Sequence, residues 1–173
     1  GLPTAAAYIL VATLAAPALV NLGVDLLAAH MFVFYSAMLS AITPPVALAA
    51  FAAAAISGEN PMRIAVVSVK FGIVAFVIPY FFVMDTRLLG IGDLSTLIMP
   101  VCTAALGAIA LASAAQGWFA GALGWIQRSV LCAGSMLLIV PGMISNIAGL
   151  AALAGVYAFQ RFYKPTNARN SSI

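Results

Sequence analysis

The sequence predicts an all-α membrane protein that crosses the bilayer several times and contains a re-entrant helical hairpin. Of its 173 residues, 65% are apolar and 6% are charged, whereas a soluble domain carries roughly 25% charged residues. The apolar residues form long runs and lack the alternation of a strand barrel. The seven Lys and Arg residues are scattered singly, so we expect no nucleic-acid partner.

A first spanning helix is expected from about Thr4 to Leu22, interrupted by Pro17. A run of this length is close to the ~20 residues that a helix needs to cross the hydrocarbon. The chain opens with Gly1 and has no basic region before its first apolar run. We therefore expect it to start inside a membrane segment and to belong to a longer protein.

The second apolar run, from about Leu26 to Ile56, is divided near its middle by Thr43-Pro44-Pro45. Both prolines lack a backbone N–H, and each pushes the preceding residue out of the helical region. The helix must therefore stop here, and a new one can start at once with Thr43 as its cap.

The two halves of this run would each measure ~18 to 22 Å, too short to cross the bilayer. The economical interpretation is a re-entrant hairpin with its tip near mid-membrane, where Ser40 and Thr43 add hydroxyls to unpaired backbone groups. Irregular backbone at that depth indicates a site for an ion or solute. The alternative is one Pro-kinked spanning helix whose freed carbonyls are satisfied by neighbouring helices.

Beyond this run, Asn60-Pro61 is expected to start an interfacial helix that leads into a span ending near Val83. The polar stretch from Asp85 to Asp93 marks the one credible internal boundary. Three further helices are expected at 94–115, 119–140 and 144–162, followed by a polar, disordered tail at 164–173. Arg128 falls inside the second of these, so either it snorkels or the residues before it form an interfacial helix.

The remaining polar and small residues are explained by helix packing, without a catalytic or metal-binding role. His30 has no second metal ligand or nucleophile near it in sequence, so it is expected to pack at an interface; a catalytic His30 in an intramembrane hydrolase is the weaker hypothesis. Cys102 and Cys132 are expected to be small buried hydrophobes. Small residues that permit close helix packing are Gly107, Ser113, Gly149 and Gly155.

Four stretches together resemble the large permease subunit of tripartite ATP-independent periplasmic (TRAP) transporters, most closely the C-terminal part of fused permeases that work with a TAXI-type solute-binding protein. They are GLPTAAAY at 1–8, AAHMFVFY at 28–35, SAITPPVALAA at 40–50 and GENPMR at 58–63. The resemblance covers about residues 1–89, and residues 93–163 are more loosely similar to the hydrophobic extension of the fused forms.

This resemblance implies sodium-driven import of a small organic anion by an elevator-type mechanism in a bacterial inner membrane. The solute would be delivered by a periplasmic TAXI-type binding protein, and the chain would be no enzyme and use no cofactor besides Na⁺ as coupling ion. A first repeat and small-subunit helices would complete the permease. The residues implied for sodium and substrate are Gly1, Leu2, Pro3, Thr4, Ser40, Ala41, Ile42, Thr43, Pro44 and Pro45.

The resemblance also implies a division of labour along the chain. Residues 1–57 would belong to the transport domain as a broken helix plus the hairpin, and 58–92 would form the interfacial arm and a scaffold helix. Residues 93–163 would be the C-terminal extension, with 164–173 as its tail. If the hairpin enters and leaves on one face, that face also carries Arg63, Lys70, Arg128 and the basic residues of the tail, Arg161, Lys164 and Arg169. The positive-inside count would make this face cytoplasmic, whereas the resemblance implies that it is periplasmic, and the periplasmic side is expected. The alternative to a carrier is a non-transporting membrane scaffold.

Overall fold

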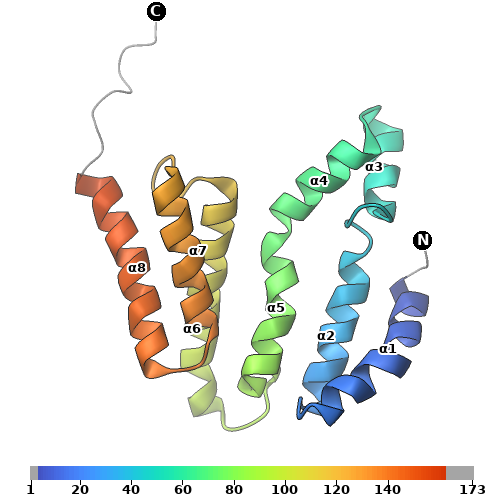
Figure 1. Ribbon diagram of the computed structural model, residues 1–173, viewed down its shortest axis with the longest axis horizontal. Coiled ribbons are helices and arrows are strands. Elements are labelled where there is room, and N and C mark those ends of the chain that lie inside the picture. Colours follow the sequence, from blue (N-terminus) through green and yellow to red (C-terminus); the bar gives the residue numbers. More distant parts are fainter. Residues whose placement is uncertain (1–3, 163–173) are drawn as a thin grey trace, which may run out of the picture.

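The computed structural model describes residues 4–162, which form eight α-helices and one short 3₁₀ helix with no strand longer than an isolated bridge (Figure 1). The elements are α1 (Thr4–Asn21), α2 (Leu26–Leu39), α3 (Leu48–Ser57), α4 (Pro61–Phe71), α5 (Ile73–Met84), η1 (Thr86–Leu89), α6 (Leu94–Gln116), α7 (Trp125–Ile139) and α8 (Met143–Phe162). Within this part of the chain α1, α6 and α8 are long and apolar enough to cross a membrane, and α4 with α5 would make a fourth span bent by 46°. The predicted class, a polytopic all-α membrane protein, is confirmed.

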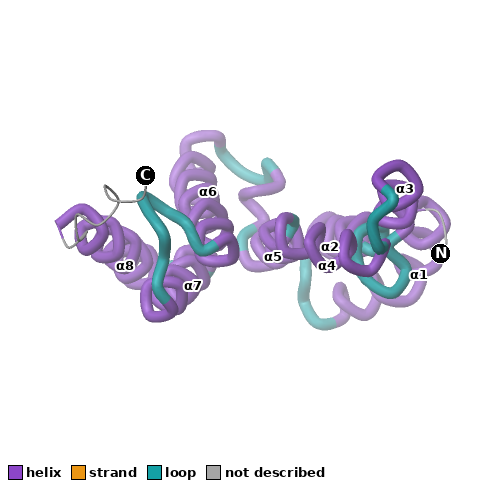
Figure 2. Tube along the Cα trace, turned by 90° about the horizontal axis from the view of Figure 1, so that it is seen from above, coloured by secondary structure: helices purple, strands orange, loops and turns teal. Residues whose placement is uncertain are grey.

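The helices form two groups that meet at α5. Viewed from above, α6, α7 and α8 lie on one side of α5 and α1 to α4 lie on the other (Figure 2). In the first group α7 packs between α6 and α8, and in the second α1 packs on α2 and α3 on α4. Helix α5 contacts α2 on one side and α6 on the other, so it joins the groups.

The starts of α2 and α4 follow from their capping residues. A carboxylate oxygen of Asp25 accepts hydrogen bonds from the first backbone N–H groups of α2. Asn60 does the same for α4, with Pro61 in the first helical position as the sequence predicts. Helix α1, by contrast, is not interrupted at Pro17, because it continues to Asn21 and is bent rather than broken (Figure 1).

The break around Thr43-Pro44-Pro45 is confirmed, because α2 ends at Leu39 and α3 begins only at Leu48. A re-entrant hairpin with its tip at this place is not confirmed. Helix α3 continues in the direction of α2 and hardly contacts it (Figure 1). The chain turns back one helix later, at Gly58 with φ +73°, so that α3 packs against α4. The prolines determine where α2 stops, and they leave the direction of α3 open.

Close packing of α7 on α8 depends on glycine. A Cβ atom on Gly149 would lie 2.6 Å from Cγ of Leu138 and 2.9 Å from the carbonyl oxygen of Gly134. Gly107 of α6 also lies close to Leu138. Gly107 and Gly149 have the predicted packing role, but Gly155 does not, since a Cβ atom there would meet nothing within 4 Å.

The expectation that the two cysteines are buried is wrong. Cys102 in α6 and Cys132 in α7 are both exposed.

Arg128 lies in the first turn of α7 and caps the end of α6. Its Nε donates a hydrogen bond to the carbonyl of Ala114 at 2.8 Å, and its Nη2 donates to that of Ala115 at 3.1 Å. The indole ring of Trp125 lies 5.6 Å from the guanidinium carbon. Residues 117–124 form a loop, so the predicted interfacial helix before Arg128 is absent. The guanidinium does not need to snorkel to the membrane surface either, because it bonds carbonyls at the end of α6.

Candidate functional site

The interruption between α2 and α3 is a folded turn whose shape is fixed by backbone hydrogen bonds. The N–H of Ala49 donates to the carbonyl of Ala41 at 2.9 Å, and the N–H of Ala47 donates to the carbonyl of Thr43 at 3.0 Å. The Pro44–Pro45 peptide bond is cis, and Ala47 has a φ of +37°. Because Ala47 is fully buried against Ala50 and Ala65, packing holds this left-handed conformation in place.

Two hydroxyl groups border the turn on the side of α2. The hydroxyl of Ser40 donates to the carbonyl of Ala37 at 2.6 Å, and that of Thr43 donates to the carbonyl of Leu39 at 2.7 Å. Each hydroxyl hydrogen is thus used within the chain, while the oxygen keeps lone pairs for a further partner. The two side chains therefore present acceptors, which is the chemistry that a cation requires.

Backbone carbonyls in the turn add to this acceptor set. Within residues 4–162, the carbonyl oxygens of Ile42, Pro44 and Pro45 accept no hydrogen bond. In a helix the N–H groups that Pro44 and Pro45 lack would bond the carbonyls of Ser40 and Ala41, and these carbonyls accept instead from the N–H groups of Thr43 and Ala49. Ile42 and Pro44 are half-buried and Pro45 is exposed. Carbonyls without a protein partner pair with water or an ion, so this turn has the composition of an oxygen-ligand site.

A cavity of about 330 Å³ opens beside the turn, between α2 and α5. Ser36, Ser40 and Thr43 line it from the side of α2 and the turn, and Phe76 and Tyr80 line it from α5. Phe32 also lines it and packs edge-on against Tyr80, with 5.1 Å between the ring centres. All of its lining side chains are uncharged at neutral pH. A bound cation would thus meet neutral dipoles alone, and no carboxylate would have to lose its water.

The predicted site residues fall into three groups. Ser40 and Thr43 lie together beside the cavity with Pro44, and the same turn contains Ala41, Ile42 and Pro45. Thr4 lies at the start of α1 and lines a separate cavity with Tyr8 and His30. Gly1, Leu2 and Pro3 lie outside the described residues.

His30 has a structural partner. Its Nδ1 lies 2.9 Å from the hydroxyl oxygen of Tyr8, which links α2 to α1, as expected of a residue that packs at an interface. No group of three or more His, Cys, Asp or Glu side chains that could hold a metal ion occurs among the described residues. The contribution of α5 to the cavity was not predicted, although Tyr80 is a visible polar residue in an otherwise apolar run.

Residues 1–97 match the family model described as the tripartite ATP-independent periplasmic transporter, DctM component. The match covers more than half of the chain and includes the whole interrupted turn. The chain belongs to this family. It is thus a membrane component of a solute-import system that works with a periplasmic binding protein, and the family is one of transporters rather than enzymes. No curated protein and no solved structure matches the chain.

Proposed function

We propose that this DctM chain carries a sodium site at the turn between α2 and α3, and that sodium bound there drives the import of a small organic anion. The observation that supports the proposal most directly is that the turn carrying the Ser40 and Thr43 hydroxyls also holds three carbonyls without a hydrogen-bond donor, those of Ile42, Pro44 and Pro45, of which Pro44 lines the cavity. Unwound backbone between two half-helices is the usual source of ligands for Na⁺ in secondary transporters.

The lengths of the two helices support a site inside the membrane. Helix α2 has 14 residues and α3 has 10, whereas a span requires about 20. Together, in the series arrangement that the fold displays, they make one discontinuous span with its break in the interior. Unpaired carbonyls at such a depth are tolerated only against protein or a water-filled cavity, and Pro44 lines the cavity beside the turn.

The same break favours an anionic solute. The backbone N–H of Val46, two residues before α3 begins, donates no hydrogen bond within residues 4–162, and Val46 lines the cavity. Helix N-termini attract negative charge through such N–H groups. Na⁺ and a carboxylate would then bind next to each other in this cavity and neutralise each other's charge.

In an elevator-type mechanism, sodium would act by binding the outward-facing and inward-facing conformations of the permease with different affinities. It shifts the populations of these two conformations only by that difference in affinity. We assign α1 to α3 to the moving transport part, α4 to an interfacial arm and α5 to the scaffold, in a bacterial inner membrane. In this proposal a TAXI-type binding protein delivers the solute, and a first repeat, as the resemblance implies, forms the other half of the permease.

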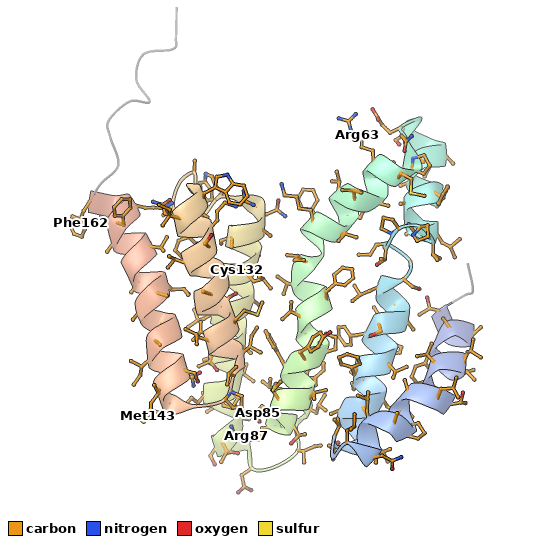
Figure 3. All side chains as sticks on the ribbon, in the orientation of Figure 1. Arg63, Asp85, Arg87, Cys132, Met143 and Phe162 are labelled. Atoms are coloured by element: carbon orange, nitrogen blue, oxygen red, sulfur yellow. The ribbon has the colours of Figure 1, made fainter. Side chains whose placement is uncertain are left out.

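The positions of the charged residues among the described residues support one orientation of the chain in the membrane. Arg63 lies at the upper end of the molecule and Phe162, next to Arg161, lies there too (Figure 3). Lys70 and Arg128 are tied to the same end, because the Lys70 carbonyl accepts from Gln116 and Arg128 caps α6. Asp85 and Arg87 lie at the opposite end.

The positive-inside rule then places the upper end in the cytoplasm. The periplasmic assignment of this face depended on a hairpin that returns beside α2, and α3 does not return. We therefore propose that Arg63 faces the cytoplasm, and that the end carrying Asp85 faces the periplasm.

Uptake into proteoliposomes containing the permease and its binding protein tests the function. An inward Na⁺ gradient is expected to drive accumulation of a labelled organic anion, and an equal K⁺ gradient is expected to drive none. Equal uptake under both gradients would refute sodium coupling. Absence of uptake together with an inaccessible turn would favour the alternative, a scaffold with a kinked helix.

A further inference from the structure

A second cavity, of about 560 Å³, lies at the end of the molecule opposite to Arg63. It is enclosed by the end of α5 with η1, by the first half of α6 and by the α7–α8 turn. Asp85, Arg87 and Met143, which all line it, lie at this lower end in Figure 3. Helix ends of this kind lie at the level of the lipid headgroups in a membrane protein.

The polar wall of this cavity is an ion pair. The Nε and Nη2 atoms of Arg87 donate hydrogen bonds to the two carboxylate oxygens of Asp85 at 2.8 and 2.6 Å. The Asp85 side chain is 11% exposed and that of Arg87 is 44% exposed. Since a guanidinium has five N–H groups, Arg87 keeps several donors for a further anionic group.

Helix α8 contributes an unpartnered acceptor to the cavity lining. The Oδ1 atom of Asn146, in the first turn of α8, is buried and has no hydrogen-bond partner. A buried acceptor without a donor is costly, so this amide oxygen selects for a ligand that brings an N–H group. Much of the remaining lining is apolar and includes Phe81, Leu88, Met99 and Leu138.

We propose that this cavity binds a phospholipid whose headgroup carries a primary ammonium, as in phosphatidylethanolamine. The ammonium donates to Oδ1 of Asn146 and to the Asp85 carboxylate, and the phosphate accepts from the free N–H groups of Arg87. The acyl chains lie against the apolar wall. A neutral zwitterionic headgroup matches the neutral Asp85–Arg87 pair, whereas an anionic lipid would add a negative charge near the Asp85 carboxylate with no ammonium to offset it.

The inference is independent of sodium coupling, because none of the residues that line this cavity lines the one beside the turn. It also concerns a part of the chain that lies largely beyond the family match, since Asn146 and the α7–α8 turn follow residue 97. A lipid here would join the α6–α8 group to α5.

Lipid selectivity tests the proposal. The protein is reconstituted into vesicles of equimolar dioleoylphosphatidylethanolamine and dioleoylphosphatidylcholine, extracted in a mild detergent, and its retained lipid is quantified by mass spectrometry. Because the trimethylated ammonium of phosphatidylcholine has no N–H, the ethanolamine lipid is expected to be enriched by about fivefold or more. Equal retention of the two lipids would overturn the proposal.

Variants of Asn146 test whether the enrichment of the ethanolamine lipid arises in this cavity. Asn146→Leu is expected to abolish the enrichment and Asn146→Asp, which keeps an acceptor, to preserve it. Asn21→Leu at the exposed end of α1 is the matched control and should leave it unchanged. Enrichment that survives Asn146→Leu would overturn the assignment, as would preferential retention of phosphatidylglycerol when that lipid is added. If Asn146→Leu fails to fold, competition by soluble glycerophosphoethanolamine in the wild-type protein decides, and failure to compete counts against the site.

Discussion

The backbone N–H of Ala49 donates a hydrogen bond to the carbonyl oxygen of Ala41 across the interruption between α2 and α3, with 2.9 Å between the two atoms. This bond ties the first turn of α3 to the end of α2. The residues between them must loop out, because the chain is longer than the gap that the bond leaves. The carbonyls of Ile42, Pro44 and Pro45 consequently have no helical partner.

Removing the hydroxyl of Thr43 is expected to weaken sodium activation. Thr43→Val keeps the shape of the side chain but deletes one proposed oxygen ligand, so the sodium concentration for half-maximal uptake should rise about tenfold, equivalent to ~1.4 kcal/mol. Thr43→Ser should behave like the wild type. Thr13→Val, which deletes a similar hydroxyl bonded within α1, is the control. Unchanged sodium activation in Thr43→Val would contradict a role for this oxygen.

The left-handed conformation of Ala47 predicts a sharp dependence on side-chain shape. Ala47→Val places a β-branched residue at φ +37° in a fully buried position, and it is expected to lower the free energy of unfolding by about 2–3 kcal/mol. Ala47→Gly should be tolerated, since glycine adopts this conformation readily. Thermal unfolding of the purified protein measures both, with Ala49→Val at an exposed position as control. Equal stability of the two valine variants would argue against the turn geometry.

Substitutions of two glycines of α8 should have opposite outcomes. Gly149→Ala forces a methyl group to within 2.9 Å of the Gly134 carbonyl, and the resulting overpacking should cost about 1–3 kcal/mol. Gly155→Ala meets open space and should be neutral or slightly stabilising, because alanine favours the helix more than glycine does. Melting temperatures in detergent test the difference. A similar loss in both variants would show that close α7–α8 packing is not the cause.

The Asp85–Arg87 pair predicts a stability change confined to acid. The hydrogen bond from the Arg87 side chain lowers the pKa of Asp85 below its ordinary value of 3.8, although partial burial acts in the opposite direction. The contribution of the carboxylate is therefore complete above that value and is lost as the pH falls through the lower, folded-state pKa.

The stability difference between wild type and Asp85→Asn should accordingly stay constant from about pH 8 to about pH 5 and vanish in stronger acid. Unfolding measured across this range provides the check. A difference that already declines near neutral pH would mean that another group governs it.

The sequence could predict the position of the break but not its direction. Two adjacent prolines remove the N–H groups that a helix needs, so the end of α2 follows from local chemistry. Whether α3 then returns beside α2 or continues away from it depends on the packing of Ala47 and Ala50 against Ala65 of the next helix. Such contacts between distant small residues leave no periodic signal.

The same limit applies to the site and to the α6–α8 group. Ser40 and Thr43 could be proposed from their place beside the prolines, whereas Tyr80 could not, because its approach depends on how α5 packs against α2. Gly149 and Gly155 look alike in sequence, and only the position of the neighbouring helix distinguishes them.

The most direct test of a sodium site at the turn is the accessibility of a cysteine beside it. Ser36→Cys, in a background with Cys102 and Cys132 replaced by serine, places a thiol in the wall of the cavity without removing a proposed ligand. Ser129→Cys on the exposed face of α7 is the control. We predict that a small hydrophilic maleimide labels position 36 in K⁺ and that Na⁺ slows this reaction about fivefold or more, with no effect at position 129. Labelling of position 36 at the same rate in both ions, or none in either, would contradict the account.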